Sequence, residues 1–203
     1  MNHKEKLKAM SPNKAIKELK NGNKRFVTNQ NSKRDYIEEV KNSSENQYPF
    51  AIVLGCVDSR VPVEILFDQG VGDIFVTRIA GNFETNTIIA GMEYACKVVG
   101  SKLIVVLGHE NCGAVKATCD NVKLGHITEL ISHIKPAIAK TKINGELNSK
   151  NKKAVNAIAK TNVQLTIKRI LEKSSILNDM NDAGTIKIVG AYYKVSTGEV
   201  TFI

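Results

Sequence analysis

The sequence lacks a long apolar run, an apolar leader after its N-terminus and any tryptophan. No stretch approaches the roughly 18 consecutive apolar residues that a membrane-spanning helix requires. The first residues, Met1 to Lys8, are mostly polar or charged and do not lead into the apolar core of a signal peptide. These absences argue against a membrane protein and a secreted one, so we expect a cytoplasmic location and no membrane partner.

The sequence also lacks any motif typical of nucleic-acid binding, although its formal net charge is +9. A strong positive charge favours nucleic-acid partners when it gathers on one face or alternates with aromatic residues. Here the excess is mostly lysine, scattered over the expected helix faces and one loop between Lys140 and Lys153. A solvated lysine surface explains this pattern better, and we expect no nucleic-acid partner.

Strands alternate with helices along the chain, which predicts a mostly parallel sheet covered on both faces. We expect strands at 50–55, 73–77, 103–107 and 186–193, and helices at 11–29, 85–99, 112 onward, 124–140 and 152–173. The Ser196-Thr197-Gly198 turn returns a last antiparallel edge strand at 200–203. The predicted fold class is therefore α/β: a mostly parallel central β-sheet flanked by helices, with an N-terminal helical arm and this C-terminal edge strand.

A chain of 203 residues is long enough to bury a sizeable core and short enough to form one domain. No repeat or linker divides it, so we expect a single domain at 1–203, with the arm at 1–47 and an α/β core at 48–203. Within the arm, Ser11 is a predicted N-cap and Pro12 lies in the first helical turn. The polar segment from Asn31 to Gln47 has little to bury, and we expect it to wrap a surface.

Two short segments carry side chains that can bind a metal. Cys56 follows the apolar run 50–55, and His109 and Cys112 follow the apolar run 103–108 as a His-x-x-Cys pair. A lone cysteine is more often a small buried hydrophobe, and a single His-x-x-Cys pair is weak evidence for a metal. Both segments, however, come at the carboxyl ends of expected parallel strands, where ligands gather. Two thiolates and one imidazole are a set that zinc favours, and they leave one tetrahedral position open.

Asp58 and Arg60 lie close in sequence to the first of these cysteines. Zinc held by two thiolates and one imidazole has a formal charge near zero, so it acidifies water less than zinc on three imidazoles does. Asp58 can help by accepting a hydrogen bond from the zinc-bound water, and Arg60 can grip that carboxylate with two hydrogen bonds. Two other interpretations stay open: Asp58 is itself the fourth ligand, or the pair is an ordinary salt bridge at a turn.

Longer motifs surround these residues. They are Cys56-Val57-Asp58-Ser59-Arg60-Val61-Pro62 and Gly108-His109-Glu110-Asn111-Cys112-Gly113-Ala114, with further stretches at 19–26, 67–70, 78–82 and 189–193. Together they resemble the β-class carbonic anhydrases over nearly the whole chain. The resemblance implies one Zn²⁺ per chain on Cys56, His109 and Cys112, and reversible hydration of carbon dioxide to bicarbonate and a proton by zinc-bound hydroxide. It also implies an Asp58–Arg60 pair that acts as a gate, with Asp58 as the fourth ligand in a closed state.

The resemblance further implies a substrate pocket. Gln47 resembles the side chain that donates a hydrogen bond to a carbon dioxide oxygen, and the Gly113 backbone N–H would be a second donor. Phe75 and Tyr94 resemble the apolar wall that keeps the cleft dry, although each taken singly is a core residue by default. In the family the glutamine and the wall come from across a dimer interface. A homodimer or a larger homo-oligomer, such as a tetramer, is therefore implied, with the active site at the dimer interface.

One departure from the family separates its subgroups. Members with a non-catalytic bicarbonate pocket carry a tryptophan three residues before the first zinc cysteine, where this chain has Val53. The chain therefore resembles the subgroup whose zinc is open at neutral pH. Two alternatives remain: a hydrolase of a carbon dioxide analogue (carbonyl sulfide or carbon disulfide) on the same zinc, or a non-catalytic zinc-stabilised protein.

Overall fold

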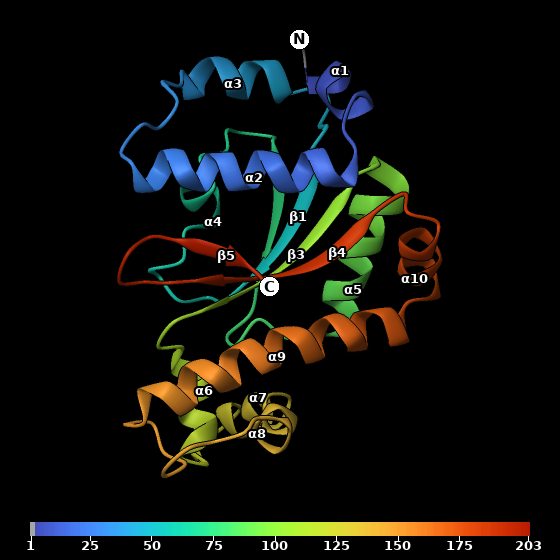
Figure 1. Ribbon diagram of the computed structural model, residues 1–203. Coiled ribbons are helices and arrows are strands. Elements are labelled where there is room, and N and C mark those ends of the chain that lie inside the picture. The colour runs from blue at the N-terminus through green and yellow to red at the C-terminus, as the bar shows by residue number, and fades with distance from the viewer. Residues whose placement is uncertain (1–2) are drawn as a thin grey trace.

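The centre of the chain is a five-stranded sheet with the strand order β2-β1-β3-β4-β5 (Figure 1). The computed structural model describes residues 3–203. Neighbouring strands are parallel across β2 (Ile74–Arg78), β1 (Ala51–Gly55), β3 (Leu103–His109) and β4 (Lys187–Tyr193). The last strand, β5 (Val200–Phe202), is antiparallel to β4. The predicted fold class, a mostly parallel sheet with an antiparallel C-terminal edge strand, is confirmed.

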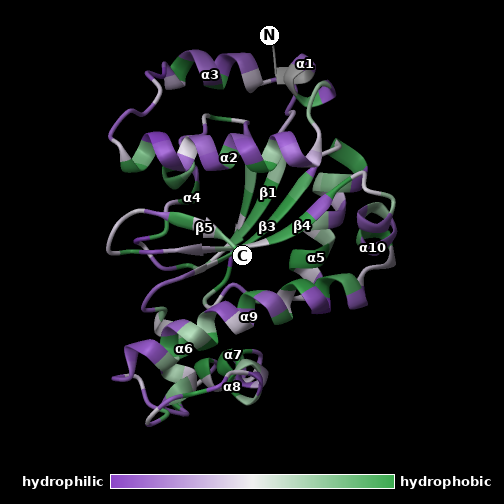
Figure 2. Ribbon diagram, viewed as in Figure 1, coloured by the Kyte–Doolittle hydropathy of each residue, from purple (hydrophilic) through white to green (hydrophobic). Residues whose placement is uncertain are grey.

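Helices surround this sheet, and the hydropathy colouring places the apolar residues along the strands between them (Figure 2). The helical elements are α1 (His3–Lys8), α2 (Pro12–Val27), α3 (Tyr36–Ser43), α4 (Val63–Leu66), α5 (Asn86–Glu93), the π-helical turn η1 (Tyr94–Val99), α6 (Gly113–Cys119), α7 (Ile127–Ser132), α8 (Lys135–Lys140), α9 (Lys152–Lys173) and α10 (Ser175–Asp182). Among the described residues, no helix is long and apolar enough to cross a membrane.

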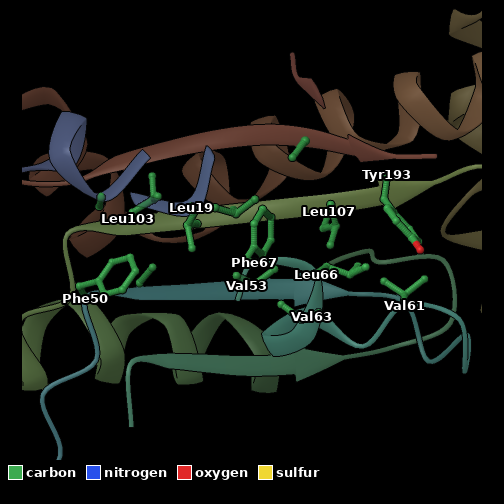
Figure 3. Packing of buried hydrophobic residues seen from close by; sticks show 14 of the residues in the cluster. Leu19, Phe50, Val53, Val61, Val63, Leu66, Phe67, Leu103, Leu107 and Tyr193 are labelled. Atoms are coloured by element: carbon green, nitrogen blue, oxygen red, sulfur yellow. The ribbon is translucent and has the colours of Figure 1, made fainter. Parts of the chain in front are cut away.

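The central strands bury both of their faces because they are continuous apolar runs. In β3 every residue is buried, and Leu103, Val105 and Leu107 point to one face. There they pack with residues of α2 and α4, among them Leu19 and Leu66 (Figure 3). The alternate residues of β3 face the other way and pack against α5, α9 and α10. The carboxyl ends of β1 and β3 are thereby fixed side by side.

The predicted helix boundaries are confirmed where a cap defines them. Ser11 caps α2, since its side chain accepts a hydrogen bond from the Lys14 backbone N–H. Thr85 caps α5 in the same way, with the donor on Ile88. Gly100 ends η1 with a φ of 98°, a left-handed conformation that glycine adopts without strain.

The segment from Asn31 to Gln47, expected to have little to bury, contains the short helix α3. Asp35 starts this helix by accepting hydrogen bonds from two backbone N–H groups, and no residue of α3 is buried.

One prediction about local structure is wrong. The helix expected at 124–140 is two helices, α7 and α8. Pro136 lies in the first turn of α8, and a proline has no N–H to continue the hydrogen bonds of the preceding helix.

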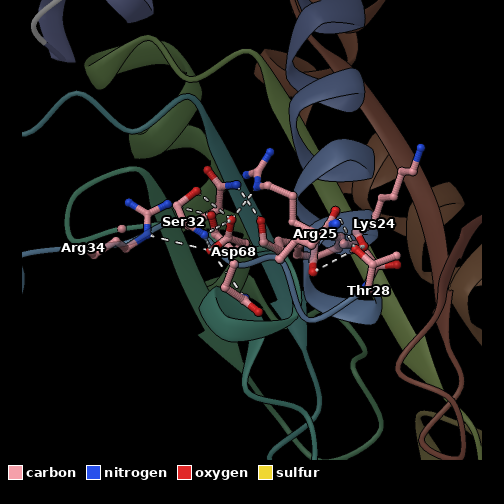
Figure 4. A network of polar contacts seen from close by, with 12 residues as sticks. Lys24, Arg25, Thr28, Ser32, Arg34 and Asp68 are labelled. Atoms are coloured by element: carbon pink, nitrogen blue, oxygen red, sulfur yellow. Dashed lines mark hydrogen bonds and ion pairs between the residues drawn. The ribbon is translucent and has the colours of Figure 1, made fainter.

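A polar network ties the N-terminal arm to the core (Figure 4). The Asp68 carboxylate accepts hydrogen bonds from Arg25 Nε at 2.5 Å and from the hydroxyl of Ser32 at 2.9 Å. Arg34 donates to the Asp68 backbone carbonyl at 2.7 Å, and the side chain of Arg34 also contacts Glu39 in α3. Through Asp68, the network fastens α2 and the start of α3 to the turn before β2.

Candidate metal centre

The structure brings Cys56, His109 and Cys112 together at the carboxyl ends of two adjacent strands. Cys56 follows β1, His109 is the last residue of β3, and Cys112 immediately precedes α6. One sulfur or ring-nitrogen atom from each residue lies within 4.8 Å of the others. All three residues are buried, with exposed fractions of 3%, 0% and 1%. The parallel pairing of β1 with β3 accounts for this convergence.

A tight turn carries the chain from His109 back to Cys112. Asn111 has a φ of 55°, a left-handed conformation that asparagine tolerates better than most residues. Its backbone N–H donates to Asn156 Oδ1 of α9 at 3.0 Å. Beneath the turn, a Cβ on Gly108 would lie 2.6 Å from a methyl group of Val163, so glycine lets α9 approach the strand closely. Helix α9 therefore supports the segment that presents two of the three side chains.

The imidazole of His109 offers an unused lone pair to this cluster. Its Nδ1 lies 2.9 Å from the Glu110 carbonyl oxygen, so Nδ1 carries the proton that is donated there. The other nitrogen, Nε2, is buried and has no hydrogen-bond partner among the described residues. A buried acceptor without a partner is costly. A metal ion at this position would satisfy it.

The two cysteine sulfurs form a coupled pair. The thiol of Cys112 donates a hydrogen bond to Cys56, which lowers the pKa of Cys56 to about 4. The same contact, together with burial, raises the pKa of Cys112. One sulfur of the pair is thus already disposed to be a thiolate, the form that binds metal. With the free lone pair of His109, the residues present fit a zinc ion.

Asp58 lies at the edge of this cluster and is held by Arg60. The Arg60 Nε donates to Asp58 Oδ1 at 2.9 Å, and Nη2 donates to Oδ2 at 2.7 Å. This guanidinium holds the pKa of Asp58 below its ordinary value. Asp58 Oδ2 lies 3.9 Å from His109 Nε2, so the carboxylate is a neighbour of the place where a metal would sit. Arg78 completes the turn by donating to the backbone carbonyls of Cys56 at 2.8 Å and Asp58 at 2.6 Å.

The predicted pocket residues divide into two groups. Gly113 directly follows Cys112 and lies beside the cluster, as do Asp58 and Arg60. Gln47 is exposed and precedes the amino end of β1, whereas Cys56 follows its carboxyl end, a separation of roughly 16 Å along the strand alone. Phe75 is the second residue of β2 and pairs with Ile52, near the amino end of β1. The ring of Phe75 contacts that of Tyr94 edge-on, with 6.2 Å between the centroids. A single chain therefore does not bring these three side chains to the cluster.

An open cavity of about 720 Å³ lies away from the cysteine cluster. It is bounded by the start of α3, by α4 and by the turn before β2, and its lining includes Arg34, Asp68 and Gln69. Apolar side chains that are exposed in the single chain also line it, namely Tyr36, Ile65 and Val71. None of the three cluster residues lines this cavity.

A mostly parallel α/β sheet with a buried Cys-His-Cys cluster at its strand ends is the arrangement of a protein that can bind a metal ion there. Comparison with known proteins gives the family. The family model described as carbonic anhydrase matches residues 51–200. The chain belongs to the carbonic anhydrases, and within them to the β class. The resemblance deduced from the motifs is confirmed.

Individual relatives support this assignment over most of the chain. A carbonic anhydrase of Mycolicibacterium smegmatis is 38% identical over 94% of this chain and 92% of its own length. Carbonic anhydrase 2 of Mycobacterium tuberculosis is 32% identical over 93% of this chain and 91% of its own length. Among solved structures, a Coccomyxa β-carbonic anhydrase in complex with acetazolamide superposes with a TM-score of 0.71, at 28% identity, and the match covers 80% of this chain and 75% of that one.

Two contacts that shape the site could not be predicted from the sequence, although one of the residues involved, Arg78, lies in the motif at 78–82. Asn156 supports the turn at Asn111 from 45 residues away, and Arg78 holds the Cys56–Asp58 turn from 20 or more residues away. Such contacts leave no periodic or spaced pattern. The sequence offers one weak sign of them. Each is made by a polar residue next to apolar residues, and the apolar pattern does not explain why a polar side chain is there.

Proposed function

We propose that this protein hydrates carbon dioxide reversibly to bicarbonate and a proton, with one zinc ion held by Cys56, His109 and Cys112. The observation that carries the proposal is the buried imidazole of His109. Its Nε2 has no hydrogen-bond partner among the described residues, and one of its ring nitrogens lies within 4.8 Å of the two cysteine sulfurs. The reaction is inferred from membership of the β class. The identity of the metal is inferred from the ligand set, because zinc favours thiolate and imidazole donors.

When bound, zinc would act as a Lewis acid that lowers the pKa of a water molecule and so supplies a nucleophile near neutral pH. The role of Asp58 is to accept a hydrogen bond from that water and orient it toward the substrate. Arg60 keeps the carboxylate in place through its two hydrogen bonds. Because both carboxylate oxygens are engaged by Arg60, the arrangement supports an Asp58 that stands beside the metal and does not coordinate it. We propose the Asp58–Arg60 pair as the gate between this state and a closed one.

The substrate pocket is proposed to form between two copies of the chain. Gln47, Phe75 and Tyr94 lie far from the cluster in one chain, so they would serve the site of the partner subunit. Three features support a partner here. Strand β2 lies at the edge of the sheet and is only half-buried, and Tyr94 is 48% exposed. The cavity before β2 is lined in part by the exposed apolar side chains of Tyr36, Ile65 and Val71. A solved relative of the same fold from Sordaria macrospora is described as tetrameric.

The metal site can be tested with a matched pair of cysteine variants. Cys56→Ser removes a proposed ligand, whereas Cys96→Ser changes another buried cysteine, which lies in η1 and belongs to a different hydrophobic cluster from Cys56 and Cys112. We expect one zinc per chain in the wild type and in Cys96→Ser, and far less in Cys56→Ser. Stoichiometric zinc in Cys56→Ser would show that the ligand assignment is wrong. Carbon dioxide hydration, measured on the same samples, should follow the zinc content.

A further inference from the structure

Gly81 lies between the proposed metal site and helix α9. It is in the loop that follows β2, and its backbone N–H donates to Cys56 Sγ at 3.4 Å. Its φ of 82° is left-handed, and an added Cβ would come within 3.3 Å of the Ala114 side chain. The position therefore requires glycine, and the loop is held close against the cysteine.

Asn162 holds Gly81 from the other side. This residue of α9 is 1% exposed, and its Nδ2 donates to the Gly81 carbonyl at 2.8 Å. The Oδ1 of the same amide is buried without a hydrogen-bond partner among the described residues. Burying an amide is costly unless it is hydrogen-bonded. Apolar packing of α9 therefore does not explain an asparagine here, whereas the contact with Gly81 does.

We propose that Asn162 is a positioning residue for the Cys56 sulfur in the metal site. By fixing the carbonyl of Gly81, it fixes the orientation of that residue, and the Gly81 N–H then points at Cys56 Sγ. Hydrogen bonds to a ligating sulfur orient it and tune its donation to the metal. The inference rests on the proposed metal site and goes beyond it, because Asn162 touches neither metal nor substrate.

The rest of the loop is anchored independently. Glu84 is 2% exposed, and both of its carboxylate oxygens lie 2.9 Å from Arg169 Nε of α9. Lys173 adds a third contact to the same carboxylate at 2.9 Å. Loss of the Asn162 amide would therefore leave the loop attached to α9 and would act locally on Gly81.

The test compares two buried asparagines. Asn162→Leu removes the donor with little change in volume. Asn23→Leu is the matched control, since Asn23 is 6% exposed and bridges backbone groups of Leu66, Gly198 and Val200, none of which contacts the cysteines or Gly81 through these bonds. Both proteins are compared with the wild type in three measurements: zinc affinity by chelator competition, the absorption spectrum after Co²⁺ substitution, and thermal unfolding.

We expect Asn162→Leu to bind zinc about 10–100-fold more weakly, as is typical when a partner of a metal ligand is lost, and to shift the sulfur-to-cobalt absorption. Asn23→Leu should lower the unfolding temperature and leave both metal readouts unchanged. An Asn162→Leu protein that unfolds earlier but keeps the wild-type zinc affinity and spectrum would overturn the inference. If that variant does not fold, Asn162→Ser is judged by the same readouts. A wild type that binds no zinc would refute the proposed function instead.

Discussion

Arg60 grips Asp58 through two parallel hydrogen bonds, from Nε to Oδ1 at 2.9 Å and from Nη2 to Oδ2 at 2.7 Å. The backbone N–H of Arg60 adds a third donor to Oδ1, also at 2.9 Å. Three donors on one carboxylate fix its plane as well as its position. Asp58 is therefore held as an ionised acceptor beside the cysteine cluster.

Replacing Arg60 with lysine should impair hydration while leaving zinc in place. Lysine keeps the charge but presents a single ammonium group, so it cannot reproduce the two parallel bonds. We expect kcat/KM for carbon dioxide to fall about 10–100-fold, the usual loss when a group that orients a metal-site residue is removed. Stopped-flow hydration measures the fall, and metal analysis measures the zinc.

Arg25→Lys is the control for this variant, because Arg25 forms a comparable contact with Asp68 away from the cluster. Its hydration rate should equal that of the wild type. An Arg60→Lys enzyme that hydrates carbon dioxide at the wild-type rate would mean that the orientation of Asp58 does not matter to the reaction.

A site shared between two chains should be restored by mixing two inactive variants. Gln47→Leu removes the amide that one chain is proposed to give its partner, and Cys56→Ser removes a metal ligand of the chain's own site. In a symmetric dimer that contains one chain of each kind, one of the two sites regains all of its residues. Random mixing should therefore recover about a quarter of the wild-type activity. Hydration assays on co-expressed chains measure it.

The control for the mixing experiment combines Cys56→Ser with His109→Ala. Both changes fall in the metal-binding half of a site, so no mixed dimer has an intact site and activity should stay absent. Co-expressed Gln47→Leu and Cys56→Ser chains that are no more active than the average of the separate variants would contradict a shared pocket.

The metal-binding cluster could be predicted from local sequence patterns, whereas the substrate pocket could not. Cys56 and His109 could be predicted to meet because each ends a continuous apolar run, and adjacent parallel strands put their carboxyl ends at one edge. Gln47, Phe75 and Tyr94 were predicted through the family resemblance alone, and in the proposed function they meet the cluster of a second chain. The single-domain organisation and the cytoplasmic location stay predictions.

Two details of the helices were not predicted, and each has a local reason. Helix α3 is short and buries no residue, so the sequence shows no apolar stripe there, and the helix depends on the Asp35 cap. The chain divides into α7 and α8 next to Pro136, and a prediction based on the spacing of apolar residues alone does not detect that break. Asn162 could not be predicted at all, because its partner Gly81 lies 81 residues away and the contact is with a backbone carbonyl.

The Asp68 network should make stability depend on acid pH. Burial alone would raise the pKa of Asp68, but the hydrogen bonds from Arg25 and Ser32 outweigh it and leave the pKa lowered. A lowered pKa in the folded state means that this contribution is present above the unfolded pKa of about 3.9 and is lost as the pH falls through the folded value. Stability of the wild type should therefore decline below about pH 4.

Asp68→Asn tests this dependence with little change in shape, and asparagine also tolerates the φ of 48° at this position. We expect the free energy of unfolding at pH 7 to fall by about 1.5–3 kcal/mol, and the loss between pH 5 and pH 3 to be smaller than in the wild type. Urea unfolding at several pH values measures both. Asp179→Asn, at an exposed position, should change neither, and an Asp68→Asn protein with the full wild-type acid dependence would show that Asp68 does not contribute.

The most direct test of the central claim is stopped-flow hydration of carbon dioxide across roughly pH 6.5 to 9, with zinc determined on the same sample. The zinc-loaded protein should be active, and its rate should rise with pH because the attacking water must first lose a proton. Removal of zinc by a chelator should abolish the activity, and added zinc should restore it. One zinc per chain with no hydration at any pH in this range would contradict the account.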